Sequence, residues 1–233
     1  MQAPEASSTT AVRITRPDLD LSELRRSFVD IPRDPYLTVG VRHRTQTRYR
    51  IEPDRLVALE RVQLFQSTDI NPLQQYGGIK REYPDLPGWL QTSSAFRALV
   101  DHWLSLVPVP VGEFSAHQIR TVGDGMPVPE GRHRDGYEYV AVFVVERHAI
   151  RDGCARTTVW DAATDEPVLQ DVVLHDGEMV SFDDRLVLHD VTPLVPSGAV
   201  AKAYRDVIIL TYPDHSKTLR HGKVVNGAGE APA

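Results

Sequence analysis

The chain has 233 residues, a net charge of −6 and 41% hydrophobic residues, which is enough material for one globular domain with a full core. The acidic balance argues against a nucleic-acid-binding protein. No apolar run approaches the ~18 residues of a membrane span, and the N-terminus lacks an apolar signal core. A single cysteine, Cys154, cannot form an internal disulfide. We therefore expect a cytoplasmic protein with no membrane or nucleic-acid partner.

The N-terminal half combines helices with short strands. Residues 1–11 lack any periodicity and are predicted to be disordered. Residues 20–31 carry apolar side chains at helical spacing, and Pro32 ends that helix. A second helix, over 87–106, is predicted to bury the apolar residues Trp89, Phe96, Leu99 and Trp103. Short strands are predicted between the two helices, over 36–41, 45–51 and 62–66.

The C-terminal half is a succession of short strands separated by Asp, Gly and Pro turns. Residues 137–145 are almost entirely apolar, which indicates a strand buried on both faces. The other predicted strands cover 114–122, 157–161, 168–174, 178–182, 186–191 and 203–212. This order predicts a mainly β, α+β fold: a double-stranded β-helix, or jelly-roll barrel, backed by N-terminal helices. We expect a single domain over 12–213 and a mobile tail over 214–233.

A Gly/Pro-rich loop places His133 and Asp135 two positions apart, just before the apolar strand. In an extended chain, residues i and i+2 point to the same face, so both side chains can reach one point. An imidazole and a carboxylate aimed together are two of the three ligands of the facial triad that holds Fe(II). His189, near the end of a later strand, is the candidate third ligand. A lone His-X-Asp is more typical of a solvated loop. Here it is followed in order by a distant histidine, His189, and then by an arginine, Arg205, and this complete set favours a metal site.

Three sequence segments resemble those of a known family. They are Pro-Glu-Gly-Arg-His-Arg-Asp-Gly at 129–136, Asp-Arg-Leu-Val-Leu-His-Asp-Val-Thr-Pro at 184–193 and Tyr-Arg-Asp-Val-Ile-Ile-Leu-Thr-Tyr at 204–212. The chain resembles the Fe(II)/2-oxoglutarate dioxygenases, and more narrowly the bacterial subfamily that includes free L-amino-acid hydroxylases such as isoleucine dioxygenase. The likeness covers residues 62–212 and is strongest from Gln118 onward.

The resemblance implies Fe(II), 2-oxoglutarate and O₂ as cofactor and cosubstrates, and His133, Asp135 and His189 as the metal ligands. It also implies that Arg205 anchors the distal carboxylate of 2-oxoglutarate, for which the planar guanidinium fork is suited. Arg205 shares a strand face with Val207 and Ile209, where an unpaired cation would be costly. The alternative is an ion pair between Arg205 and Asp206 or another acid at the strand end.

Other polar residues are weaker candidates for ligand binding. Gln118 is a candidate cosubstrate ligand, on the same predicted face as Arg120. The candidate substrate contacts are Arg120, Tyr137, Glu138 and Arg81. The segment that contains Arg81, Gln66 and Asn71 resembles the substrate side of the subfamily. Asp184 and Arg185 are expected to form the turn that orients the His189 strand. The remaining histidines, His117 among them, lack a partner at ligand spacing and are interpreted as ordinary residues.

The function that we expect is hydroxylation of an unactivated C–H of a free, aliphatic L-amino acid, with succinate and CO₂ as coproducts. One alternative is a tailoring oxygenase that hydroxylates, desaturates or cyclises a small or carrier-bound natural product. Another is a non-catalytic jelly-roll binding or stress-response module. A cupin with another metal is disfavoured because it does not explain Arg205. Cys154 lacks the partners of a nucleophile. The sequence leaves the oligomeric state open.

Overall fold

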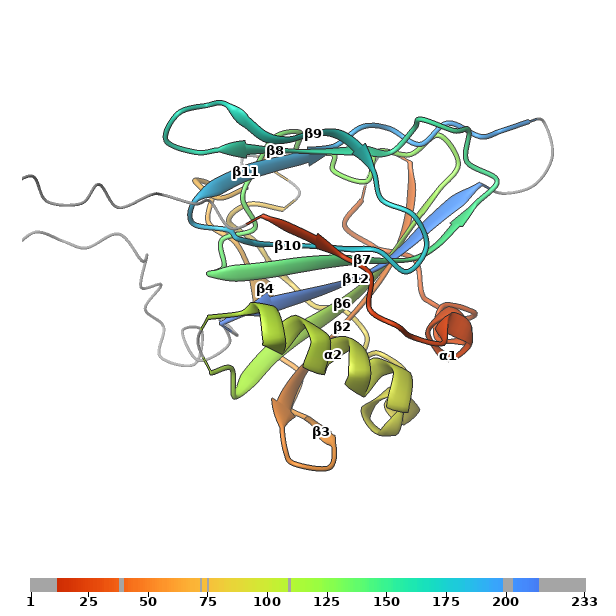
Figure 1. Ribbon diagram of the computed structural model, residues 1–233, viewed down its shortest axis with the longest axis vertical. Helices are drawn as coiled ribbons and strands as arrows, with labels where there is room; N and C mark the ends of the chain where they lie inside the picture. The colour runs from red at the N-terminus through yellow and green to blue at the C-terminus, as the bar shows by residue number, and fades with distance from the viewer. Residues whose placement is uncertain are drawn as a thin grey trace, which may run out of the picture.

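The structure is a computed structural model of the whole chain, and it describes residues 12–37, 40–71, 73–74, 76–108, 110–198 and 203–213. The predicted disordered N-terminus and the predicted mobile tail, 1–11 and 214–233, lie outside the described residues. Two facing antiparallel sheets form most of the molecule, and the helices cover the outer face of the larger sheet (Figure 1).

The larger sheet has seven strands in the order β1-β10-β7-β12-β6-β2-β3. Its strands are β1 (Arg13–Thr15), β10 (Met179–Asp183), β7 (Tyr139–His148), β12 (Tyr204–Tyr212), β6 (Glu113–Val122), β2 (Val41–Ile51) and β3 (Leu56–Ala58). The smaller sheet pairs β11 (Val187–Val191), β8 (Arg156–Asp161) and β9 (Pro167–Val173), and β4 (Leu64–Phe65) pairs with β5 (Lys80–Arg81). This arrangement confirms the predicted mainly β, jelly-roll-like fold.

Strand β7 shows why the sheet is covered on both sides. Because successive side chains of a strand point to opposite faces, its apolar run supplies two separate cores. Val140 and Val144 pack between the two sheets, whereas Ala141 and Phe143 pack toward the helices. The prediction that this strand is buried on both faces is therefore confirmed.

The helices that cover the outer face are shorter than predicted. The first helix, α1, spans only Leu21–Arg26 and continues as a turn. The predicted helix over 87–106 is split by Ser93 into a 3₁₀ segment, η1 (Gly88–Thr92), and α2 (Ser94–Leu106). Ser93 has extended backbone angles, and its hydroxyl accepts a hydrogen bond from the N–H of Phe96, so it starts a new helix as an N-cap.

The helical core differs from the prediction at one aromatic residue. Phe96, Leu99 and Trp103 are fully buried, but Trp89 is 36% exposed. Trp89 lies in η1 rather than on the buried stripe of α2, and the guanidinium of Arg26 stacks 4.3 Å from its ring. The burial of Trp89 was thus predicted wrongly, because a continuous helix was assumed. Among the described residues, no helix is long and apolar enough to cross a membrane.

Two details of strand pairing position the residues discussed below. The strand predicted over 45–51 is part of a longer strand, β2, which pairs with β6 from Val41 to Arg50. Of the strand predicted over 36–41, residues 36–37 are not in a strand, and 38–39 lie outside the described residues. Between β12 and β7 the register shifts at Asp206/Val207. Val207 pairs with Val144, but Asp206 pairs with Glu146 and Arg205 with Arg147, so β7 contains one extra residue, Val145, at this point.

Candidate active site

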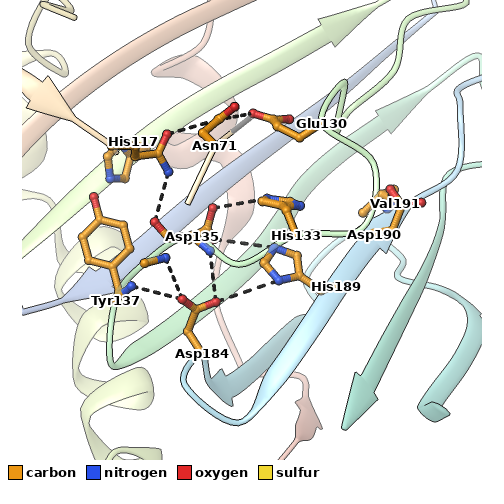
Figure 2. Close-up of polar contacts among 12 residues, drawn as sticks. Asn71, His117, Glu130, His133, Asp135, Tyr137, Asp184, His189, Asp190 and Val191 are labelled. Atoms are coloured by element: carbon orange, nitrogen blue, oxygen red, sulfur yellow. Dashed lines mark hydrogen bonds and ion pairs between the residues drawn. The ribbon is translucent and has the colours of Figure 1, made fainter. Parts of the chain in front are cut away.

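The side chains of His133, Asp135 and His189 converge at one point (Figure 2). His133 and Asp135 lie in the loop before β7, and His189 lies in the middle of β11. The loop is joined to β11 by two backbone hydrogen bonds, from the N–H of each histidine to the carbonyl of the other, at 3.0 and 2.9 Å. Pairing of the loop with the strand therefore brings together residues that are more than fifty positions apart in the sequence.

The distances within this trio suit a shared metal ion. Asp135 Oδ1 lies 3.5 Å from His133 Nε2, and Asp135 Oδ2 lies 3.6 Å from His189 Nε2. One ligand atom from each residue lies within 4.8 Å of the others. His133 Nδ1 lies 2.9 Å from the carbonyl oxygen of Gly131. Since only a protonated Nδ1 can donate to that carbonyl, the Nε2 lone pair of neutral His133 points toward the other ligands, as metal binding requires.

The buried carboxylate of Asp184 holds the ligand loop in place. It accepts hydrogen bonds from the backbone N–H groups of Asp135, Gly136 and Tyr137 at 3.2, 2.8 and 3.0 Å (Figure 2). Its Oδ1 also lies 4.0 Å from Nδ1 of His189, a buried nitrogen that has no hydrogen-bond partner. Asp184 therefore does more than form the predicted turn, because it fixes the backbone of the loop that carries Asp135.

The electrostatics of the trio match a site built for a cation. Burial lowers the pKa of His189 to about 4, with the nearby charge of His133 acting in the same direction. Burial also acts to lower the pKa of His133, but the adjacent Asp135 carboxylate outweighs it and raises that pKa to about 9. Burial opposes ionisation of Asp135, yet the two histidines hold its pKa below the usual range. The carboxylate thus stays charged and attracts a positive charge to this point.

A cavity of about 100 Å³ opens beside these ligands. Arg205, Val207 and Ile209 of β12 line it together, as predicted from their alternation. The Arg205 side chain is 4% exposed, and two of its nitrogens, Nε and one Nη, have no hydrogen-bond partner. The alternative ion pair with Asp206 is not formed, because Asp206 points to the opposite face of the sheet, where Arg120 binds it. Arg205 thus presents an unpaired buried guanidinium to the cavity.

The structure brings only some of the predicted substrate residues to this cavity. Arg81 and Tyr137 line it. Gln118 and Arg120 lie on the other face of β6, because that strand turns His117, Ile119 and Thr121 toward the cavity. Gln118 instead accepts a hydrogen bond from Thr45 and donates one to Ser27, on the helix side of the sheet. The shared face of Gln118 and Arg120 was predicted correctly, but its orientation toward the cavity was wrong.

Glu138 also lies away from the cavity. It immediately follows Tyr137 and therefore points to the other side of the chain, where Arg185 lies 3.3 Å from its carboxylate at the surface. Apart from the candidate ligand Asp135, the carboxylate that lines the cavity among the described residues is that of Glu130, in the loop before His133. Glu130 accepts a hydrogen bond of 3.0 Å from Asn71 (Figure 2).

Sequence reasoning missed two further cavity residues, His117 and Arg44. His117 was interpreted as an ordinary histidine because its partners are distant in the sequence. Arg44 lies on β2, directly across from Ile119 of β6. The strand alternation of β6 contained a usable signal: once Ile119 is assigned to the cavity face, His117 must share that face.

Gln66 links the substrate-side segment to the ligand loop. Its amide nitrogen donates a hydrogen bond of 3.0 Å to the backbone carbonyl of Asp135, and its amide oxygen accepts one from Arg81. Asn71 also donates to that amide oxygen, at 3.3 Å. The grouping of Gln66, Asn71 and Arg81 in one segment was a sequence interpretation, and the structure places all three beside the ligand loop.

Comparisons with solved structures show proteins of similar fold. The chain shares 26% identity with a bsmA homolog from Methylobium petroleophilum PM1, with a TM-score of 0.67 over 81% of this chain and 79% of that one. It resembles the structure of IDO from Bacillus thuringiensis with a TM-score of 0.63 and 16% identity, over 82% of this chain and 81% of that one. The Fe(II)/(alpha)ketoglutarate-dependent dioxygenase TqaL, at 17% identity and a TM-score of 0.59, covers 82% of this chain and 73% of its own.

A comparison with curated protein sequences finds no match. Residues 25–211 match the family described as 2OG-Fe dioxygenase, a span that contains the His133–Asp135–His189 trio and Arg205. Such enzymes use Fe(II), 2-oxoglutarate and O₂, which suits a trio of two imidazoles and one carboxylate beside an unpaired guanidinium. The chain belongs to the 2OG-Fe dioxygenase family.

Proposed function

We propose that this dioxygenase hydroxylates a C–H bond of a free L-amino acid, with His133, Asp135 and His189 as the iron ligands and Arg205 as the anchor of 2-oxoglutarate. The observation that carries the proposal is the joint geometry. Three ligand atoms lie within 4.8 Å of one another, and a buried guanidinium without a carboxylate partner lines the same cavity. A facial arrangement of this kind leaves positions on the metal for other ligands.

The bound iron and 2-oxoglutarate supply the oxidative chemistry, with succinate and CO₂ as coproducts. The protein's own residues position the reactants. Arg205 offers its fork to a carboxylate in the cavity, and Thr121 lies directly opposite it across the β12–β6 pair. Val207 and Ile209 line the same cavity, and their apolar side chains exclude water from the chain of the cosubstrate.

The substrate side of the cavity supports an amino acid. Arg81 and Tyr137 offer donors for a carboxylate, and Glu130 offers an acceptor for an ammonium group. Apolar side chains also line the cavity, and these suit a hydrocarbon side chain of the substrate: Leu64, Pro127, Val128, Ile119 and Val191. This combination supports the aliphatic amino acid expected from the sequence resemblance.

Incubation of the purified protein with Fe(II), ascorbate, 2-oxoglutarate and single L-amino acids tests the proposal. The expected result is succinate together with a product that is 16 mass units heavier than one of the amino acids. His133→Ala and Asp135→Ala are expected to lose iron binding, measured by equilibrium dialysis, and with it succinate formation. Iron binding without oxidation of any amino acid would remove the substrate assignment, whereas unchanged iron binding in both variants would remove the metal site.

The control for these variants is His175→Ala. His175 follows β9 and is not among the residues that line the cavity. This substitution also removes an imidazole, but iron binding and succinate formation are expected to remain within about twofold of the unsubstituted protein.

A further inference from the structure

Three arginines besides Arg205 line the cavity. Two of them, Arg44 of β2 and Arg81 of β5, lack a carboxylate partner among the described residues. Among the residues that the structure describes, no carboxylate forms an ion pair with either of them, and the Nε atom of each is buried without a hydrogen-bond partner. Arg42, which also lines the cavity, differs in this respect because its guanidinium is paired with Asp34 at 2.9 Å.

The contacts that hold Arg44 and Arg81 are all with neutral groups. The guanidinium of Arg44 stacks 4.5 Å from the ring of Tyr83, and Arg81 donates to the hydroxyl of the same tyrosine at 3.5 Å. Arg81 also donates to the amide oxygen of Gln66 and stacks on Tyr76. These partners fix the positions of the two cations without neutralising their charge.

His117 also holds the guanidinium of Arg44 in position. Burial holds the pKa of His117 well below its usual value, and the charge of Arg44 acts in the same direction, so the ring is neutral. Its Nδ1 accepts a hydrogen bond of 3.3 Å from Arg44, and its Nε2 lies 3.4 Å from the hydroxyl of Thr211. A neutral imidazole therefore serves as an acceptor that directs Arg44 and leaves its positive charge available.

The positive charges of Arg44 and Arg81 repel each other. Burial lowers the pKa of Arg81, and the nearby charge of Arg44 contributes to that lowering. The pKa of Arg44 is raised instead, because burial acts to lower it but Tyr83 and the carboxylate of Asp34 act in the other direction. Burial of a charge without a bonded counter-ion is unfavourable, and a bound anion would relieve that penalty most clearly at Arg81. The pair also lies near the candidate metal, because Gln66 contacts both Arg81 and the backbone of Asp135.

We propose that Arg44 and Arg81 together bind a free carboxylate of the substrate, separate from the cosubstrate carboxylate at Arg205. This inference rests on the proposed function and names the residues that recognise the free carboxylate of its substrate. Each guanidinium presents a planar fork that fits a carboxylate. A free carboxylate also supplies the negative charge that the two arginines lack. An amino acid whose acyl carbon is tied up in an amide, ester or thioester lacks that charge. The enzyme therefore acts on an untethered acid rather than on a carrier-bound residue.

The first experiment compares acids with their amides. The Fe(II)- and 2-oxoglutarate-loaded protein is dialysed without oxygen against an equimolar mixture of the twenty proteinogenic L-amino acids, and separately against their primary amides. Mass spectrometry of the retained fraction shows which compounds bind. At least one acid is expected to be retained at least tenfold better than its amide, and admission of oxygen should oxidise that acid. Equal retention or oxidation of the amide would overturn the carboxylate receptor.

The second experiment substitutes the pair. Arg44→Gln and Arg81→Gln should each weaken binding of the retained acid at least thirtyfold, while the affinity for 2-oxoglutarate stays within about threefold. Arg44→Lys and Arg81→Lys, which keep the charge but lose the fork, should recover part of the binding. Arg61→Gln is the matched control, because Arg61 is an exposed arginine paired with Asp85. It should change neither affinity. Melting temperatures show whether each variant is folded.

The outcomes separate this inference from the proposed function. Loss of 2-oxoglutarate binding in the Arg44 and Arg81 variants would assign the pair to the cosubstrate's second carboxylate and overturn the inference. Unchanged acid binding in both folded Gln variants would overturn it as well. If the unsubstituted protein binds and oxidises neither acids nor amides but oxidises carrier-bound residues, both the inference and the free-amino-acid function fail.

Discussion

Arg120 and Arg205 lie on opposite faces of the large sheet and differ in their partners. On the helix face, the partly buried Arg120 forms two short hydrogen bonds, of 2.7 and 2.6 Å, with the fully buried carboxylate of Asp206. On the cavity face, Arg205 is more deeply buried, at 4% exposed, and has no carboxylate partner among the described residues. Of these two arginines, the unpaired one therefore lies on the side that receives ligands, where a bound anion can complete the pairing.

The largest expected effect comes from removing the unpaired charge. Arg205→Met should weaken 2-oxoglutarate binding about 100-fold, because it deletes a two-bond carboxylate contact of ~3 kcal/mol. The same substitution should raise the melting temperature of the ligand-free protein, since an apolar chain replaces an uncompensated buried cation. Calorimetric titration under nitrogen and thermal denaturation measure the two effects. A 2-oxoglutarate affinity within threefold of the original would contradict the anchor.

Asp184→Asn is expected to have the next largest effect, on iron rather than on the cosubstrate. An amide cannot accept the three loop N–H groups as a carboxylate does, and it leaves His189 without its acidic neighbour. Iron affinity should fall about 10- to 100-fold, as is usual when such a supporting group is lost. Competition with a chromogenic chelator measures it. Asp183→Asn, whose carboxylate binds only Arg185, serves as the control.

On the helix face, Asp206→Asn should act on stability alone. It leaves the partly buried Arg120 with a neutral partner, and we expect a loss of about 2 kcal/mol in the free energy of unfolding. The affinity for 2-oxoglutarate should change by less than about twofold, because neither Asp206 nor Arg120 lines the cavity. Urea denaturation and the cosubstrate titration together check this. A clear loss of 2-oxoglutarate affinity would show that the two faces are not independent.

The pH dependence of metal binding tests whether His133, on the cavity face, is protonated before the metal ion binds. With a pKa of about 9, His133 carries a proton at neutral pH that a metal ion must displace. Metal affinity should therefore be fully developed above pH 9 and fall about tenfold per unit as the pH drops toward 7. Calorimetry in two buffers of different ionisation enthalpy should give one proton released per ion. Release of no proton at neutral pH would contradict the charge assignment.

The smallest effect is expected at Gln118, which the sequence placed wrongly. Gln118→Leu removes hydrogen bonds to Thr45 and Ser27 on the helix face and should cost ~1 kcal/mol of stability. The 2-oxoglutarate affinity should change less than about twofold. A tenfold loss would restore the sequence-based assignment of Gln118 to the cosubstrate.

Local signals in the sequence were sufficient for the fold and for the candidate ligands. Strand alternation and turn residues predicted the β-rich half, and the two-residue spacing of His133 and Asp135 predicted their common direction. What the sequence does not contain is the absolute orientation of a strand whose two faces are both buried. On β6, His117 and Gln118 are equally plausible inward residues until the position of the helices is known, and this ambiguity produced the wrong choice.

The second limit concerns residues brought together by pairing of distant strands. Arg44 and Arg81 are 37 positions apart in the sequence, and only the β2–β6 pairing and the short β4–β5 pair place both at one cavity. Glu130 replaced Glu138 as the cavity carboxylate for a related reason. Loop residues before a strand have no fixed alternation, so their direction depends on contacts such as the one from Asn71.

The extra residue in β7 decides the chemistry at Arg205. Were Val145 paired in regular register, Glu146 would lie opposite Arg205 and Arg147 would fall beyond it. In that position the carboxylate of Glu146 would form an ion pair with Arg205. A bound dicarboxylate would then have to displace Glu146 from the guanidinium. The irregularity instead turns Glu146 to the far side, where it accepts a hydrogen bond from Tyr204. The extra residue in β7 thus leaves the Arg205 guanidinium without a carboxylate from the protein itself, so that it can pair with the carboxylate of a dissolved ligand.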